Sequence, residues 1–446
     1  MDEAPTSTPI STRLQRIAEQ ARNAPGMVFS NLAHHMNLSL LREAYRRTRK
    51  NGAVGVDGQT SQGYTSNLED NLQGLWSRVR SGIYTAPPVR RVHIPKGDKA
   101  GETRPIGIPS FEDKVLQRGA AMILEAIYEQ DFYDCSFGFR PGRSAHQAIS
   151  QLWNGLMDIK GGWVLEVDIR GFFDNIDHSH LREILGLRVR DRSICRLIGK
   201  WLNAGVLEAR SLSFPETGTP QGGVASPLLA NIYLHEVLDK WFHEVVKPRL
   251  QGPAFMVRYA DDFVIVFSSD RDALRVRDVL PKRFERFGLE IHEGKTRLFP
   301  FHMPSRFHRN ALIAESFDFL GFTHYWGRTR NGTWVVQHKT AKSRLCRALK
   351  KITGWCRLNR HAPLPIQHQV LTTKLRGHYS YFGITGNYRP LERFCREVEH
   401  AWVKWLRRRS HKSNKNWQKM AGLLARYRLP RPRIARRAAA RRVANP

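Results

Sequence analysis

The sequence has few cysteines and few acidic residues for its length. Its five cysteines are an odd number spread across 446 residues, and no Cys-x-x-Cys pair occurs. This spacing argues against a disulfide framework and against structural zinc, so we expect buried, apolar cysteines in a reduced protein. Asp and Glu number 40 against 72 Lys and Arg, a net charge of +32. Such an excess indicates a polyanionic partner, nucleic acid first and an anionic membrane second.

Long apolar runs are also lacking. No stretch of about 18 apolar residues occurs, so we expect no membrane-spanning helix. The first residues are acidic and contain no apolar core segment, which argues against a secretory signal or transit peptide and favours a cytoplasmic protein. A hydrophobic content of 41% with 10% aromatic residues predicts an ordered chain of two or three domains.

Residues 255–267 carry the most informative pattern. Two apolar, strand-like runs flank a tight turn with adjacent carboxylates, Asp261 and Asp262. Runs rich in Val, Ile, Phe and Tyr are typical of buried strands, and two anions at their tip cost free energy unless a cation offsets them. Mg²⁺ is the cation that clustered carboxylates suit. The pattern therefore predicts a metal-binding hairpin; the alternative is a surface turn that Asp-Asp merely favours.

Asp168 supplies a third carboxylate. It follows the strand-like run 163–167 and precedes Arg-Gly-Phe-Phe-Asp-Asn-Ile-Asp. Three acids around two Mg²⁺ ions suit nucleotidyl transfer, in which one metal activates a 3′-hydroxyl and the other holds the triphosphate. Taken alone, Asp168 would equally fit a turn or a helix cap.

The remaining pattern alternates helices with strands in an irregular order, which predicts an α+β fold. Expected helices cover 39–48, 111–130 and 228–246, with another starting near Asp177, and expected strands cover 88–95 and 163–169.

Several sequence blocks along the chain can be compared with those of a known family. They are Asn51–Gly58, Pro88–Ile108, Ser136–Ala145, Val167–Asp177, Gly218–Pro227, Tyr259–Asp262, Gly288 with Lys295-Thr296, and Phe319–Phe322. Together they resemble, in order, the blocks of the bacterial group II intron-encoded reverse transcriptases and maturases. The resemblance runs from about residue 28 to 325, and a thumb-like region extends it to about 434.

The resemblance implies a right-hand polymerase with fingers, palm and helical thumb. The expected segments are a flexible N-terminal extension (1–27), an N-terminal block with fingers (28–160), a palm with the last fingers elements (161–325), a thumb/maturase region (326–434) and a basic tail (435–446). The palm would carry Asp168, Asp261 and Asp262 as catalytic and metal-binding residues, with two Mg²⁺ ions for which Mn²⁺ could substitute.

The resemblance also implies a dNTP site. Phe173, five residues beyond Asp168, would be an aromatic gate that rejects a 2′-hydroxyl; the alternative is a core phenylalanine. Lys96 and Arg104 flank a Gly-rich turn and would clamp the triphosphate, unless they are ordinary solvated charges. Gln221, in Pro-Gln-Gly-Gly, would contact the incoming sugar, unless it is a plain loop residue.

Other basic residues are expected along the template and primer. Arg140, Arg143 and Ser144 would contact the template backbone, because phosphates supply most of the affinity for nucleic acid. Lys295 would approach the primer end. Its Gly-Lys-Thr is not a P-loop, since the upstream glycine spacing is wrong.

The C-terminal region mixes aromatic and basic residues. The last 46 residues contain 15 Lys or Arg and no Asp or Glu. Residues 375–383 and 402–409 interleave rings with cations, which suits stacking on RNA bases and pairing with phosphates; the alternative is an amphipathic helix whose rings lie in the core.

The expected activity is RNA-directed DNA synthesis from dNTPs on a DNA primer, with intron RNA binding that assists splicing and retrohoming. The expected location is the bacterial cytoplasm, with no membrane and no zinc. Two alternatives stay open: a domesticated reverse transcriptase in DNA repair or phage defence, and an RNA-binding splicing cofactor without required polymerase activity.

Overall fold

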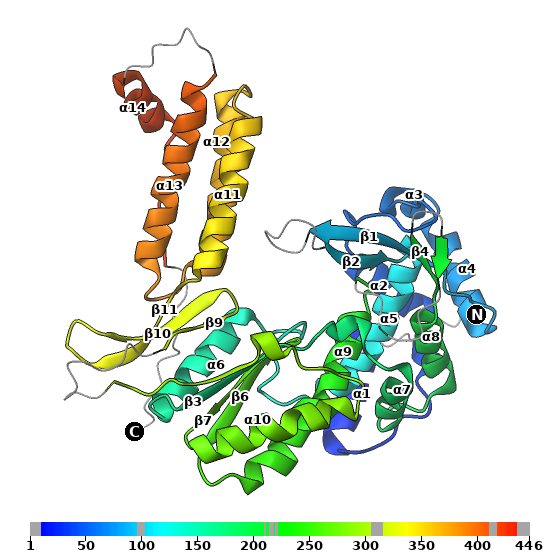
Figure 1. The fold of residues 1–446 in the computed structure, drawn as a ribbon. Coiled ribbons are helices and arrows are strands. Elements are labelled where there is room, and N and C mark those ends of the chain that lie inside the picture. The colour runs from blue at the N-terminus through cyan, green and yellow to red at the C-terminus, as the bar shows by residue number, and fades with distance from the viewer. Residues whose placement is uncertain are drawn as a thin grey trace. The chain divides into compact units, whose positions relative to one another are not determined.

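The computed structural model describes residues 10–95, 103–208, 211–213, 218, 222–304, 315–409 and 417–434. It is a mixed α and β structure (Figure 1), as the sequence pattern predicts. The chain divides into two compact units. Unit 1 comprises residues 1–144, 165–265 and 269–298, and unit 2 comprises 145–164, 266–268 and 299–446.

Unit 1 is mainly helical. Its helices are α1 (Ile10–Asn23), α2 (Leu38–Arg47), α3 (Ser61–Thr65), α4 (Leu68–Arg80), α5 (Phe111–Tyr128), α7 (His178–Gly186), α8 (Arg192–Leu202), α9 (Ser226–Leu234) and α10 (Asp270–Glu285), with the short or irregular turns η1 (Ala33–His35), η2 (Phe172–Asp174), η3 (His235–Val246), η4 (Lys247–Arg249) and η5 (Glu293–Lys295). The helix expected over 228–246 is in fact α9 continued by η3, a π-helix.

Two four-stranded sheets accompany these helices. The first has the order β2-β1-β4-β5, from Thr103–Ile108, Val89–Pro95, Val206–Glu208 and Ser211–Ser213. The second has the order β6-β7-β3-β8, from Ala254–Tyr259, Asp262–Phe267, Trp163–Val167 and Arg297–Pro300. Its apolar strands β6 and β7 are almost wholly buried, and helix α10 lies along this sheet, with the ring of Phe284 6.2 Å from that of Phe263 (Figure 1).

Helix starts follow local capping rules. Asp177 begins α7 by accepting a 2.8 Å hydrogen bond from the backbone N–H of His180, and Ser110 begins α5 by accepting a 3.1 Å bond from the backbone N–H of Asp113. These caps, together with α2, β1 and β3, confirm the elements expected near residues 39–48, 88–95, 111–130, 163–169 and 177.

Part of the segment expected as an N-terminal extension, Ile10–Asn23, forms helix α1. Helix α1 is amphipathic and buries Ile17 and Ala21, and it packs on α5. The segment after α1 is fixed by Arg188, whose guanidinium donates to the carbonyl of Met27 at 2.7 Å. Burying an apolar helix stripe and satisfying an arginine both favour order.

Unit 2 combines one helix, one sheet and a helical bundle. Its elements are α6 (Ala145–Asp158), β9 (Phe317–Phe319), β10 (Phe322–Arg328), β11 (Trp334–Thr340), α11 (Lys342–Leu358), α12 (Leu364–Phe382), α13 (Tyr388–Arg407) and α14 (Trp417–Arg426), with the strand order β11-β10-β9. Figure 1 shows α11, α12 and α13 side by side.

The unit boundaries differ from the segments expected from sequence. Helix α6, expected in the fingers block, belongs to unit 2: Trp153 donates to the carbonyl of Val336 at 2.8 Å, and His146 bonds the carbonyl of Tyr381 at 2.8 Å. The strands β9 and β10, expected in the palm, also group with the bundle. The expected basic tail, 435–446, lies outside the described residues.

The aromatic residues of the bundle are largely core residues. Trp402 is 0% exposed and donates to Gln367 at 2.8 Å, and Tyr379 is also buried. Trp405 is half-buried, with the guanidinium of Arg408 5.2 Å from its ring. Of the two interpretations of the ring-and-cation pattern, core packing holds for Trp402, since its ring packs inside the bundle. Cys346 departs from expectation: it is exposed, whereas Cys135, Cys356 and Cys395 are buried.

Two opposed histidines in unit 2 predict an acid-sensitive stability. His324 of β10 faces His338 of β11, and both are buried. Burial lowers the pKa of His338 to about 4. The pKa of His324 lies well below its usual value, because His324 is buried and because a charge on the neighbouring His338 would repel its own. Because the unfolded chain binds these protons from about pH 6.5 downward and the folded one does not, unfolding becomes easier as pH falls.

We expect His338 alone to remove about 2 kcal/mol from the free energy of unfolding between pH 7 and pH 5. Thermal unfolding of the full chain at the two pH values measures the change. His338→Gln is the comparison variant, since it keeps a polar side chain without the titration. A wild type whose pH dependence equals that of the variant would contradict the prediction.

Candidate active site

The turn between β6 and β7 presents two aspartates. Tyr259 ends β6, Asp261 lies in the turn and Asp262 is the exposed first residue of β7. Ala260 has φ +59°, a left-handed conformation that costs a non-glycine residue about 1 kcal/mol or more. The hairpin expected from sequence is confirmed, and its turn is strained at the residue before Asp261.

Asp168 lies beside this turn. It follows β3, the strand next to β7 in the sheet, and its backbone carbonyl accepts a 2.8 Å bond from His292. Its negative charge acts on Asp261: burial is the first cause that raises the pKa of Asp261, and the carboxylate of Asp168 adds to it. The positive charges of Arg104 and Arg258 act in the opposite direction. The structure thus brings Asp168, Asp261 and Arg104 together.

Lys295 neutralises Asp168 directly. Its Nζ donates to Asp168 Oδ2 at 2.8 Å, with the two side chains 52% and 44% exposed. Helical turn η5 places the lysine there, and Thr296 Oγ1 lies 3.5 Å from the Asp168 nitrogen. The sequence interpretation placed Lys295 near a primer; in the structure it is the counterion of the first aspartate.

The donor chemistry of this site suits a hard cation. Asp261 is half-buried, and a second carboxylate opposes its ionisation, so a bound cation would favour the ionised form. Within the described ranges, however, no three His, Cys, Asp or Glu side chains converge as a ready metal site. One oxygen of Asp168 is already engaged by the ammonium group of Lys295.

Two elements flank the aspartates. Arg104 is exposed on β2, opposite Ile94 of β1. Phe173 is half-buried in η2, whereas its neighbour Phe172 is buried, and the two rings lie 5.3 Å apart. Phe172 is a core residue, and the gate role of Phe173 stays a prediction. Lys96 and Gln221, the other two residues expected at the dNTP site, lie outside the described residues.

The residues expected to contact the template are mostly engaged elsewhere. The Arg140 side chain is 3% exposed; it pairs with Glu129 at 2.9 Å and donates to the carbonyls of Tyr133 and Ser136. The guanidinium of Arg140 is therefore buried and fully engaged within the chain, and its expected contact with the template stays a prediction. Arg143 pairs with Asp134 at 2.6 Å but stays 30% exposed, and Ser144 is half-buried.

A buried polar network behind the turn was missed by the sequence interpretation. Arg258 in β6 and Asp239 in η3 form an ion pair with both side chains 0% exposed. Asn231 of α9 and Ser136 complete it. The available signal was Arg258 itself, a single charge in an otherwise apolar strand, which predicts a buried partner without naming it.

The backbone of Gly138 lies against the turn that carries Asp261. A Cβ at this position would lie 2.3 Å from the backbone nitrogen of Ala260, so the backbone of one of the two must move. We expect Gly138→Ala to lower primer-extension activity about tenfold through misplacement of the turn. Gly74→Ala is the matched control, because nothing lies within 4 Å of its Cβ and α4 tolerates alanine. Equal activities of the two variants would contradict a tightly held turn.

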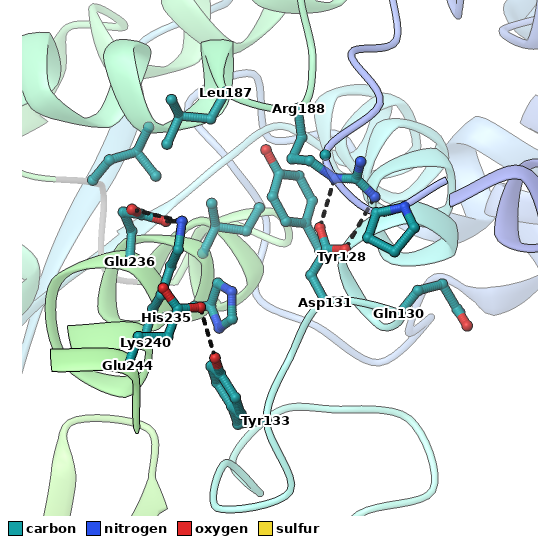
Figure 2. Close-up of a pocket in the computed structure, with 14 residues that line it drawn as sticks. Tyr128, Gln130, Asp131, Tyr133, Leu187, Arg188, His235, Glu236, Lys240 and Glu244 are labelled. Carbon is teal, nitrogen blue, oxygen red and sulfur yellow. Dashed lines mark hydrogen bonds and ion pairs between the residues drawn. The ribbon is translucent and has the colours of Figure 1, made fainter. Parts of the chain in front are cut away.

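A separate pocket of about 510 Å³ is lined in part by Pro25, Tyr128 of α5 and His235 of η3 (Figure 2). The charged residues drawn there are each paired: Asp131 with Arg188, Glu236 with Lys240, and Glu244 with Tyr133. Its lining includes none of the three aspartates of the site. Because its charges are internally matched, the pocket does not compete with the aspartate cluster as the candidate active site.

Comparisons with known proteins agree with this geometry. Residues 94–324 match the family described as reverse transcriptase (RNA-dependent DNA polymerase), a range that contains Asp168, Asp261 and Asp262. The chain is 36% identical over 364 residues to protein YkfC of Escherichia coli, covering 73% of this chain and 91% of that protein.

The names of two further relatives refer to introns. The group II intron-encoded protein LtrA of Lactococcus lactis subsp. cremoris is 29% identical over 471 residues, covering 89% of this chain and 77% of that protein. The nuclear intron maturase 4, mitochondrial, of Arabidopsis thaliana is 27% identical over 244 residues, covering 54% of this chain and 28% of that protein.

Proposed function

The chain belongs to the reverse transcriptase family, among the group II intron-encoded reverse transcriptases and maturases, and from this premise we propose that it extends a DNA primer on an RNA template at the Asp168–Asp261–Asp262 cluster. The observation that carries the proposal is the buried hairpin whose strained turn sets Asp261 beside Asp168. Asp168, Asp261 and Asp262 are the residues that would hold divalent metal, which the family uses, with Mg²⁺ as the proposed ion. When bound, that metal would activate the 3′-hydroxyl and hold the triphosphate.

The side chains around the cluster have distinct proposed roles. Arg104, exposed on the β1–β2 hairpin and acting electrostatically on Asp261, would pair with the dNTP triphosphate. Lys96 and Gln221 remain proposed dNTP contacts. Phe173, half-buried beside Phe172, would pack under the incoming sugar and exclude a 2′-hydroxyl.

The proposed architecture is a right hand. Unit 1 would supply the fingers and most of the palm, and unit 2 the thumb and maturase region. Helices α11 to α13 carry many basic residues around an apolar core, an arrangement that suits RNA phosphates. The proposed partners are therefore template and intron RNA, a DNA primer or target, and dNTPs. Within the part of the chain that the structure describes, no helix is long and apolar enough to cross a membrane.

Primer extension by the purified full chain tests the proposal. An RNA template with an annealed DNA primer, dNTPs and Mg²⁺ should yield cDNA. A chain that binds this RNA but adds no nucleotide with Mg²⁺ or Mn²⁺ would overturn the polymerase assignment and favour a splicing cofactor. Inspection of the DNA around the gene for a folded intron separates a mobile element from a domesticated enzyme.

A further inference from the structure

Arg258 lies directly behind the Asp261 turn. It is the fifth residue of β6 and is 0% exposed, and its charge is matched by Asp239 of η3, to which Nε donates at 2.7 Å. Replacing a buried ion pair with apolar residues of similar volume is often neutral or even stabilising. The pair is therefore weak evidence for a purely stabilising role, and its other contacts indicate what it does.

The remaining donors of Arg258 reach the turn and its support. One Nη donates to the carbonyl of Ala260 at 3.0 Å and to Asn231 Oδ1 at 3.0 Å, and the other donates to Ser136 Oγ at 2.8 Å. Ala260 is the strained residue that immediately precedes Asp261. The guanidinium of Arg258 thus holds the carbonyl of the peptide that joins Ala260 to Asp261.

The segment containing Ser136 braces the same strand. The backbone N–H of Arg258 donates to the carbonyl of Cys135 at 2.7 Å, and Phe137 donates to the carbonyl of Arg258 at 2.9 Å. Asn231 donates to the carbonyl of Gly138 at 2.7 Å. These bonds set the 135–138 segment against β6, so the arginine connects β6, α9, η3 and this segment at the base of the turn.

We propose that Arg258 is a positioning residue, which fixes the peptide between Ala260 and Asp261 and thereby the direction of the Asp261 carboxylate. The inference rests on the proposed polymerase function and deepens it. Only a planar, multidentate donor can hold Asp239, Ser136 and the Ala260 carbonyl together, because a lysine ammonium lacks the rigid fork. The positive charge also acts on Asp261, where it opposes the effect of burial on the pKa of that carboxyl.

Arg258→Lys tests the proposal, with Arg188→Lys as its matched control. Arg188 is a second buried arginine of unit 1; it pairs with Asp131 at 2.8 and 3.0 Å and donates to the carbonyl of Met27, without contact to the Asp261 turn. Both variants keep a positive charge and lose a guanidinium fork. The melting temperature of each variant reports the structural cost.

Two metal readouts report the position of Asp261. The first is Mn²⁺ binding to the full chain with annealed primer and template, titrated by electron paramagnetic resonance. The second is the Mg²⁺ concentration that gives half-maximal single-nucleotide addition. We expect Arg258→Lys to raise both half-saturation values about tenfold and Arg188→Lys to leave both within about twofold of wild type, although both melt earlier.

Each outcome decides the inference. A folded Arg258→Lys whose two metal half-saturation values match those of Arg188→Lys overturns it. If Arg258→Lys does not fold, Ser136→Ala replaces it: removal of this one acceptor should raise the values about threefold, and unchanged values overturn the inference. A wild type that extends no primer overturns the proposed function as well, whereas normal wild-type extension beside an unshifted variant overturns the positioning role alone.

Discussion

Asp261→Asn is expected to lower primer extension at least about 1,000-fold, equivalent to about 4 kcal/mol of transition-state stabilisation. The substitution keeps the size of the side chain and removes the charge that a divalent ion would need. Single-nucleotide addition on an RNA template, measured at saturating dNTP, gives the change. Template binding should stay within about twofold, because phosphate contacts of the remaining chain supply that affinity.

The same substitution should not destabilise the fold. Burial and the charge of Asp168 both raise the pKa of Asp261, so an uncharged amide removes an unfavourable charge when no metal is bound. We therefore expect a melting temperature equal to or above that of wild type. Asp278→Asn, at an exposed position of α10 paired with Arg277, is the control and should retain full activity. Residual activity above about one tenth in Asp261→Asn would remove this carboxylate from the reaction.

Phe173→Val is expected to raise incorporation of ribonucleotides relative to deoxyribonucleotides about 100-fold. A smaller side chain would leave room for a 2′-hydroxyl, and addition of dNTPs should fall only slightly. The ratio of kcat/KM for CTP and dCTP in single-nucleotide addition measures the effect. Because the change concerns the substrate sugar, it separates a gate from a general loss of activity.

Phe172→Leu is the matched control for this prediction. Phe172 is the adjacent buried ring, 5.3 Å from Phe173, so its truncation should lower stability by about 1 kcal/mol without a change in sugar selectivity. A Phe173→Val enzyme that discriminates as well as wild type would refute the gate. A selectivity change seen only in Phe172→Leu would show that Phe172, and not Phe173, is the gate.

Local patterns predicted the elements that carry the site. The hairpin of β6 and β7, the strand before Asp168 and the cap at Asp177 each depend on residues close together in the sequence, and all three are confirmed. Periodicity and capping are local properties, so a single sequence expresses them well.

Pairings between distant residues could not be predicted in the same way. In the sequence, Arg140 cannot be told apart from a phosphate-binding arginine, and only the fold shows that its guanidinium pairs with Glu129. The partner of Arg258 lies 19 residues away on η3, where nothing in the helical pattern marks Asp239 as buried. Such assignments need the packing of separate elements, which the chain specifies only collectively.

The ammonium group of Lys295 occupies the position of a counterion to Asp168. Both side chains are about half exposed, so the pair contributes no more than about 1 kcal/mol and exchanges readily. Lys295 is thus a weak internal counterion of the first aspartate, and a divalent ion that binds several oxygens at once would displace it. If metal loads the site as proposed, the freed ammonium group at its edge would be available to a polyanion.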